Sequence, residues 1–277
     1  MKKQIVMLTA VCSAFFNAEA QTLPKPSPLG EVKQEIGVAK ISLEYSRPSA
    51  KDRKVFGNVV PYNELWRFGA NACTKITTDE TLYFGSNELK AGTYSLFAIP
   101  NENGTWEIIF NTDTKAGVAD YTKEKDAFRV KATAKENSFT ETFTLGFDNI
   151  KNESASLVVL WEKLRVEIPF TLKTSESAKR NIEEAIKKGE NLDKVYNSAA
   201  NYFFSTKDNQ TALTYAEQSL KLKESYSALF LKARILKEQG NDKEALTLAE
   251  KALQLAEKEN AKGFADFISG TLKGWKK

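Results

Sequence analysis

The segment YSRPSAKDRKVFGNVVPYNELWRFGAN, residues 45–71, interrupts a strand-like part of the sequence, and the rest of the chain is organised around it. Residues 38–45 before it and residues 74–78 after it alternate between apolar and polar side chains, the pattern of a strand with one buried face. The segment itself holds three arginines, two prolines, two glycines and a tryptophan, with five basic and two acidic side chains. We interpret it as a functional segment carried between two strands.

The same alternation continues as far as residue 172. It is seen in residues 38–45, 74–78, 93–99, 106–110, 128–134, 138–145 and 157–172. Turn residues such as those at 101–104 and 148–149 separate these runs, and no helical period lies between them. We therefore predict an antiparallel β-sandwich or open barrel at residues 27–172. The expected core aromatic residues are Trp106, Phe110, Phe143, Phe147 and Trp161.

After residue 173 the apolar residues recur with a helical period. Residues 174–189 place Ala178, Ile182 and Ile186 on one face, and Gly189 follows as a helix terminator. Further on, ALTYAEQSLKL at 212–222 matches ALTLAEKALQL at 245–255, 33 residues later. The sequence therefore predicts a helical domain at residues 174–277 that contains two copies of one unit.

These two copies resemble tetratricopeptide repeats, because small side chains stand where paired helices must pack closely. The matching positions are Ala200, Ala212, Ala233, Ala245 and Ala252. The resemblance implies a short helical array. Two roles stay open for it: support for the β domain, or a docking surface for a protein partner.

The first 20 residues are predicted to be a signal peptide. Lys2 and Lys3 precede an apolar run at 5–16, and Ala18 to Ala20 form a small-x-small cleavage site. The run is shorter than the roughly 20 residues that a membrane-spanning helix needs. We expect no membrane span, and a protein that is periplasmic or secreted after cleavage near Ala20. Residues 21–30, with three prolines, are predicted to be an extended linker.

Composition excludes several classes of function. The chain has no histidine, so a triad with a histidine base or a zinc site with histidine ligands is excluded. The net charge of +4 over 277 residues is too small for a nucleic-acid-binding surface. After cleavage only Cys73 remains, so no internal disulfide can form. Residues 111–117, NTDTKAG, resemble a calcium loop but place Lys115 at a ligand position. We predict no metal and no cofactor.

Several motifs follow one another in the N-terminal half. They are QEIG at 34–37, YSRP at 45–48, VVPY at 59–62, LWR at 65–67, GAN at 69–71 and AGTYSLFAIP at 91–100. Together they resemble the bacterial family catalogued as domain of unknown function 2911, over about residues 25–172. The resemblance implies no activity, because the family has none assigned. The chain departs from the family pattern at Ala72, where we would expect a glutamate.

The central segment carries the candidate ligand-binding residues. Guanidinium groups offer forked donors to a carboxylate or phosphate, and aromatic rings offer stacking surfaces. The candidates are Arg47, Arg53, Tyr62, Trp66, Arg67 and Asn71. We also expect one helical turn at residues 62–66, after Pro61. One hypothesis is a non-enzymatic binding or scaffolding protein with a pocket for a small anionic or saccharide ligand. In the other, the arginines form a structural network with Asp52, Glu64 and nearby carbonyl groups.

The sequence favours binding over catalysis, and no catalytic residue is assigned. A carboxylate-dependent hydrolase of an envelope polymer remains an alternative. Its acid pair would come from Asp52, Glu64, Asp79, Glu80 and Asp126, but no spacing selects a pair. Cys73 lacks a histidine partner, so we expect it to be a small residue within a strand.

Overall fold

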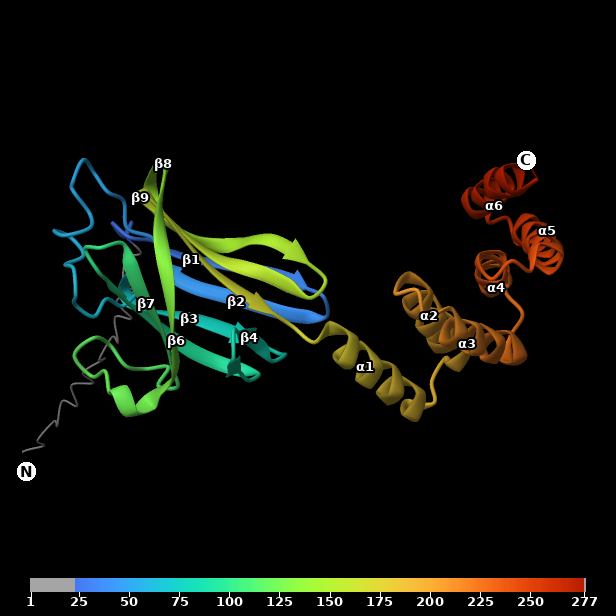
Figure 1. Cartoon of the computed structure of the whole chain (residues 1–277), viewed down its shortest axis with the longest axis horizontal. Helices are drawn as coiled ribbons and strands as arrows, with labels where there is room; N and C mark the ends of the chain where they lie inside the picture. The colour runs from blue at the N-terminus through green and yellow to red at the C-terminus, as the bar shows by residue number, and fades with distance from the viewer. Residues whose placement is uncertain (1–22, 277) are drawn as a thin grey trace, which may run out of the picture. The chain divides into compact units, whose positions relative to one another are not determined.

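The computed structural model describes residues 23–276 (Figure 1). The chain divides into two compact units, of which the first ends at Leu172 and the second begins at Lys173. The predicted signal peptide, residues 1–20, lies outside the described residues. Among residues 23–276, no helix combines the length and the apolar character that a membrane crossing requires.

One antiparallel sheet forms the first unit, and its nine described strands run in the order β1-β2-β3-β6-β7-β8-β9-β4-β5. The strands are β1 (Leu29–Ile36), β2 (Ala39–Ser46), β3 (Ala70–Thr78), β4 (Leu82–Phe84), β5 (Asn87–Leu89), β6 (Gly92–Pro100), β7 (Thr105–Asn111), β8 (Asp126–Lys151) and β9 (Ser154–Thr171). A 3₁₀ turn, η1 (Lys123–Lys125), precedes β8. An antiparallel sheet followed by helices confirms the predicted fold class.

The alternation of apolar and polar residues builds the core of this unit. In β2, Ile41, Leu43 and Tyr45 are buried, whereas Lys40 and Glu44 are exposed. Burial of these apolar side chains is the main stabilising term of the sheet, and in β6 and β7 both faces are buried, with Phe97 and Ile109 in a smaller second cluster. The predicted core aromatic residues all belong to the core, four of them fully buried and Phe147 packed against it at its margin: Trp106, Phe110, Phe143, Phe147 and Trp161.

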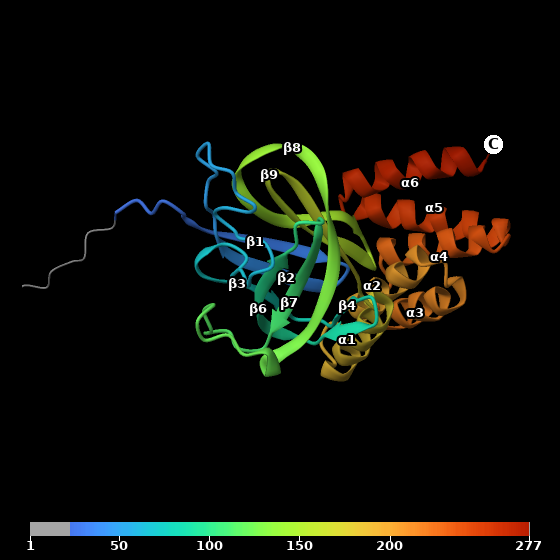
Figure 2. The ribbon, with the colours of Figure 1, turned by 60° about the vertical axis from the view of Figure 1, so that its left-hand side comes forward.

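Strand β8 joins the two parts of the sheet. It pairs with β7 as far as Thr133, and with β9 from Ala134 onward. Figure 2 shows β8 and β9 arching together over the sheet. Residues 128–134 and 138–145, which the sequence predicts as two strands, are parts of this one strand. Its register against β9 shifts between Glu136 and Thr140, a bulge that interrupts the alternation without ending the strand.

The sheet also curls back on itself at the end of β2. The N–H of Phe143 donates to the carbonyl of Pro48, and the N–H of Ala50 donates to the carbonyl of Glu141, both at 2.8 Å. A bridge between Ser49 and Thr142 lies between these two bonds. The segment after β2 is thereby attached to β8, which gives the sheet the character of an open barrel.

Three details differ from the sequence prediction. Strand β1 begins at Leu29, within the predicted linker. Strands β4 and β5, of three residues each, were not predicted. The helical turn expected at residues 62–66 is wrong: Asn63 takes a left-handed conformation with φ of 61°, which a right-handed helical turn does not allow. Trp66 instead pairs with Ala98, with N–H to carbonyl distances of 2.8 and 2.9 Å.

The second unit consists of six described helices. They are α1 (Thr174–Lys188), α2 (Leu192–Ser205), α3 (Asn209–Leu222), α4 (Tyr226–Glu238), α5 (Asp242–Lys258) and α6 (Lys262–Trp275). Gly189 takes a left-handed conformation and ends α1 as predicted. The matching sequences at 212–222 and 245–255 fall in α3 and α5, the second helices of two helical hairpins. Their alanines, including Ala212 and Ala245, are fully buried, which allows close helix packing.

Candidate functional site

A cavity of about 310 Å³ lies beside the central segment, where the loop between β2 and β3 approaches β9. Its walls come from this loop, the start of β3, the loop before β8, and β9. They are formed by Pro48, Val59, Val60, Leu65, Trp66, Arg67, Gly69, Ala70, Asn71, Val118 and Trp161. Three of the six predicted ligand-binding residues, Trp66, Arg67 and Asn71, are among them.

The cavity combines an apolar wall with one cation. Val59, Val60, Leu65 and Val118 supply aliphatic surface, and Arg67 is the one charged residue among those that line it. Small-molecule sites in proteins have this composition, mostly apolar with a few placed polar groups. The arrangement suits a ligand with one anionic group and an apolar body.

The loop that carries Arg67 has an unusual backbone. Phe68 and Asn71 have positive φ angles of 54° and 57°, and Phe68 is fully buried. A bulky residue in the left-handed region is rare and costs on the order of 1–3 kcal/mol, and such residues gather at functional sites. The hydroxyl of Thr74 donates to the Phe68 carbonyl at 2.5 Å and stabilises this conformation.

Arg67 lies across the same loop. Its Nη1 donates to the carbonyl oxygen of Asn71 at 2.6 Å. The amide of Asn71 in turn donates to the carbonyl of Ser27 at 3.1 Å and to Oγ of Ser46 at 3.3 Å. Asn71 is therefore a positioning residue that holds the loop, whereas Arg67 is the group that offers charge to the cavity.

The charge of Arg67 is not neutralised within the part of the chain that the structure describes. No carboxylate oxygen of residues 23–276 lies within 4.0 Å of its guanidinium group, and its Nε and Nη2 make no hydrogen bond there. Glu64, the nearest acidic residue in sequence, is exposed. A half-buried guanidinium with two uncommitted nitrogens can bind a carboxylate or phosphate in a forked geometry.

Trp66 belongs to the core and touches the cavity only at its margin. It is 9% exposed and stacks on Trp161 with 6.0 Å between ring centroids. Its Nε1–H donates to the carbonyl of Gly69 at 2.9 Å. This hydrogen bond connects the ring to the strained loop. Trp66 therefore lines the cavity with little exposed ring surface, and its role in stacking on a ligand stays a prediction.

Arg47 lies elsewhere and connects strands. Its Nε donates to the carbonyl of Phe143 at 3.2 Å and its Nη2 to Oγ1 of Thr144 at 2.9 Å, both on β8. The side chain passes close to Gly30 in β1, where a Cβ added to the glycine would lie 2.9 Å from Cδ of Arg47. Arg47 therefore bridges the gap between the first two strands and β8.

Arg53 and Tyr62 are likewise absent from the walls of the cavity. Nε and Nη2 of Arg53 donate to the carbonyls of Ala50 and Ser49 at 2.9 and 2.8 Å. Tyr62 is half-buried and packs against the core. The six predicted residues do not form a single pocket. For Arg47 and Arg53, the structure instead has the alternative in which arginines bind nearby carbonyl groups.

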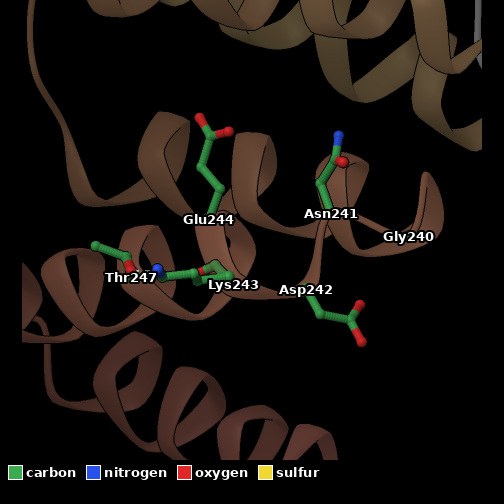
Figure 3. A pocket seen from close by; sticks show the side chains of 6 residues that line it. All are labelled: Gly240, Asn241, Asp242, Lys243, Glu244 and Thr247. Atoms are coloured by element: carbon green, nitrogen blue, oxygen red, sulfur yellow. Dashed lines mark hydrogen bonds between the residues drawn. The ribbon is translucent and has the colours of Figure 1, made fainter.

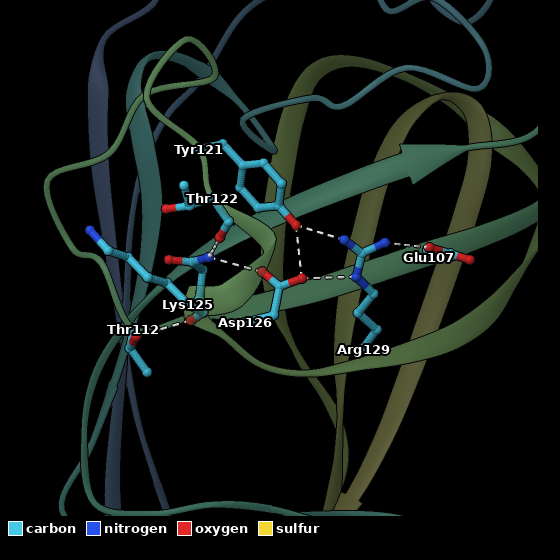
Figure 4. A network of polar contacts seen from close by, with 8 residues as sticks. Glu107, Thr112, Tyr121, Thr122, Lys125, Asp126 and Arg129 are labelled. Atoms are coloured by element: carbon cyan, nitrogen blue, oxygen red, sulfur yellow. Dashed lines mark hydrogen bonds and ion pairs between the residues drawn. The ribbon is translucent and has the colours of Figure 1, made fainter.

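A polar network near the cavity was not predicted (Figure 4). Asp126 accepts hydrogen bonds from the hydroxyl of Tyr121 at 2.7 Å, the amide of Asn111 at 2.9 Å and Nε of Arg129 at 2.9 Å. Arg129 also donates to Glu107 at 3.0 Å. Burial, and the hydrogen bond to Asp126, raise the pKa of Tyr121 to about 12. The alternation at 128–134 places Arg129 on the polar face, but its partners come from distant segments.

This network holds the loop between β7 and β8 against the sheet. Tyr121 packs on Phe97 with 5.1 Å between ring centroids, and Val118 of the same loop reaches the cavity. The loop covers Cys73, whose thiol donates to the carbonyl of Leu96 at 3.1 Å. Burial raises the pKa of Cys73 to about 11, which makes it a poor nucleophile at neutral pH.

The acidic residues considered for hydrolysis lie outside the cavity. Asp126 is engaged in the network described above, and Asp79 accepts a hydrogen bond from the N–H of Lys40 at 2.7 Å. Asp52 and Glu64 are exposed. Among residues 23–276, no group of three or more cysteine, aspartate or glutamate side chains is arranged to hold a metal ion.

A second cavity, of about 560 Å³, lies at the turn between α4 and α5 (Figure 3). The side chains of Asn241 and Glu244 point to one side of the helix start and that of Asp242 to the other. The remaining lining residues are Gly240, Lys243 and Thr247. Because one turn and the first residues of one helix form it, we assign no ligand to this cavity.

Comparison with known proteins adds one finding. The family model described as "Protein of unknown function (DUF2911)" matches residues 27–170. The match covers the sheet and ends before α1. The comparisons with curated proteins and with solved structures found no match.

Proposed function

The chain belongs to the family described as Protein of unknown function (DUF2911), and we propose that it is an exported, non-enzymatic binding protein whose β unit takes a small anion with an apolar body. The family assigns no activity, so the proposal depends on the cavity at residues 67–71. Export is supported by the sequence alone, through Lys2, Lys3 and the cleavage site at Ala20.

The observation that carries the proposal is the state of Arg67. Its guanidinium group is half-buried, has no carboxylate partner among residues 23–276, and uses only Nη1 in a hydrogen bond, to the carbonyl of Asn71. An anionic ligand could therefore accept two charge-assisted hydrogen bonds, from Nε and Nη2. The strained conformation of Phe68 fits the same interpretation, since stability has been given up to hold this loop in place.

The walls of the cavity favour an amphipathic anion over a saccharide. A saccharide needs several hydrogen-bonding partners around its ring, whereas most of the lining side chains here are aliphatic or aromatic. Val59, Val60 and Val118 would contact an apolar tail, and Trp161 lines the same cavity. A volume of about 310 Å³ limits the ligand to a short chain or a single ring.

No acidic side chain lines the cavity, which supports ligand binding over carboxylate-dependent hydrolysis at this position.

The helical unit has a separate proposed role. Equivalent hairpins, α2 with α3 and α4 with α5, support the resemblance to tetratricopeptide repeats and hence a surface for protein contacts.

The proposal can be tested with a panel of small ligands of defined charge. Short and medium fatty acids, aromatic carboxylates, alkyl phosphates and neutral saccharides would be titrated into the protein. Trp66 and Trp161 line the cavity, so the change in their fluorescence reports occupancy. We expect a response to at least one apolar carboxylate or phosphate ester and none to its uncharged amide or alcohol. A response confined to saccharides, or no response across the panel, would contradict the proposal.

A further inference from the structure

Helix α6 has two faces of different character. Ala265, Ile268 and Leu272 are buried against the neighbouring helices. The opposite face is exposed, and Phe267 on it keeps 54% of its surface accessible. The ring of Phe267 contacts Phe230 of α4 and Phe264 of its own helix edge-on, with 5.6 and 6.1 Å between centroids, and still keeps more than half of its surface exposed. A large aromatic side chain that is more than half exposed on an ordered helix suggests a contact surface.

The centre of this exposed face is formed by glycines. Gly263, Gly270 and Gly274 lie within about 40° of one another around the helix axis, at 100° per residue. A Cβ added at any of them would meet no atom within 4 Å. Packing within the described chain therefore does not require glycine at these positions, although glycine is unfavourable within a helix. A face without side chains lets a second helix approach closely.

Two opposite charges occupy the edge of the same face. Asp266 and Lys273 are exposed, and neither makes an ion pair or hydrogen bond with another described residue. They are seven residues apart, too far to meet along their own helix. The point midway between them lies between Ser269 and Gly270.

We propose that this face of α6 binds the same face of α6 in a second copy of the chain, with the two helices antiparallel about a two-fold axis at that midpoint. Because the axis reverses the helix direction, Asp266 of each copy then faces Lys273 of the other, and two ion pairs form. The charges of Asp266 and Lys273 thus make the exposed face of α6 complementary to the same face of a second copy.

The position of Phe267 is also compatible with this two-fold axis. The midpoint between Gly270 and Gly274 lies as far beyond the axis as Phe267 lies before it. In the antiparallel pair, each Phe267 is therefore level with the gap between these two glycines of the second copy, at 1.5 Å rise per residue. A ring that enters a hole left by missing side chains is the packing that helix pairs use.

The interface is small, because α6 has 14 residues and is about 21 Å long. It belongs to the class of weak interfaces below about 1,200 Å². We therefore expect a monomer–dimer equilibrium of the full chain by sedimentation between about 10 µM and 1 mM. A monomer throughout this range would overturn the proposal.

A charge exchange separates this interface from other modes of association. Asp266→Lys and Lys273→Asp should each weaken dimerisation at least tenfold, since each places like charges opposite one another. The double variant should restore it. Lys221→Asp, an exposed change on α3, is the matched control and should have no effect. Failure of the double variant to restore the dimer would reject the antiparallel pairing.

A second variant tests the glycine face without weakening the fold. Gly270→Leu places a side chain in open space in the single copy, and leucine favours the helix. The thermal transition should stay at the same temperature or rise, while the dimer is lost. A dimer that persists with Gly270→Leu would show that copies associate through another surface.

Discussion

The hydroxyl group of Tyr45 donates a hydrogen bond to the carbonyl oxygen of Leu145 and accepts one from the N–H of the same residue, each at 3.0 Å. Both residues are almost completely buried. The side chain of Tyr45, in β2, therefore satisfies the two backbone hydrogen bonds that a neighbouring strand would make with Leu145 of β8. Together with the backbone bonds after β2, it holds the curled sheet closed.

Tyr45→Phe should destabilise the β unit by at least about 2 kcal/mol. The ring is retained, but the buried N–H and carbonyl of Leu145 both lose their partner, and each unsatisfied group costs about 1–3 kcal/mol. Urea denaturation measures the change. Tyr94→Phe is the matched control, because Tyr94 packs on the same core and its hydroxyl has no hydrogen bond to residues 23–276. Equal effects of the two substitutions would contradict this account of the closure.

Gly69→Ala should destabilise the protein by at least about 1 kcal/mol, through crowding of a packed backbone. The added Cβ would lie 3.1 Å from the carbonyl oxygen of Ser46 and 3.1 Å from Oγ1 of Thr74. Thermal unfolding measures the change. Gly146→Ala is the control, since a Cβ there would meet no atom within 4 Å. If Gly69→Ala were as harmless as the control, the close packing of the 67–71 loop would be disproved.

Tyr121 should make stability fall at high pH. Its pKa is about 12 in the folded chain, against an ordinary value of 10.0, so the folded state holds this proton more tightly than the unfolded state. The contribution is complete below pH 10 and is lost as the pH rises through about 12. Tyr121→Phe should therefore flatten the fall in unfolding free energy over this range. The ultraviolet difference titration of the two proteins should show a phenol that ionises near pH 12; ionisation near pH 10 would refute the buried network.

Cys73 should react slowly while the chain is folded. Raising the thiol pKa from 9.0 to about 11 lowers the thiolate fraction at pH 8 on the order of 100-fold. Carbamidomethylation of a Cys12→Ser chain, followed by mass spectrometry, measures the rate. Denaturant should increase it by at least that factor. Equal rates in the folded and unfolded chain would mean that the loop before β8 does not shield the thiol.

The sequence predicted the sheet best where one face of a strand is buried. Residues 38–45 alternate clearly, and residues 39–45 lie within β2, where Ile41 and Leu43 are buried and Lys40 and Glu44 are exposed. Strands β4 and β5 have three residues each, too few for a period of two to be seen. The bulge between Glu136 and Thr140 shifts the pattern of β8 and makes one strand look like two. The repeat offset placed α3 and α5 correctly, because buried alanines recur in both.

The candidate site was predictable in part. Trp66, Arg67 and Asn71 line the cavity, as their position in the arginine-rich segment suggested. Arg47 does not, because its partners lie on β8, 96 and 97 residues later, and no local pattern reveals them. Val118 was missed for the same reason: it comes from a loop whose position depends on the network around Asp126.

Arg67 lines the cavity, whereas Arg53 of the same segment is exposed and does not. Arg53 therefore provides a control of the same charge. Arg67→Gln should reduce the affinity for any bound anion by at least tenfold, because charge-assisted hydrogen bonds contribute about 1.5–3 kcal/mol. The free energy of unfolding should fall by no more than about 1 kcal/mol, because the one hydrogen bond that is lost, to Asn71, is exposed and water can replace it. Arg53→Gln should leave the affinity unchanged.

The most direct measurement is therefore calorimetric titration of an apolar carboxylate or phosphate ester into the original chain, Arg67→Gln and Arg53→Gln. Our account predicts binding to the original chain and to Arg53→Gln, with affinity lost in Arg67→Gln alone. Equal affinity in all three proteins, or equal loss in both variants, would contradict it.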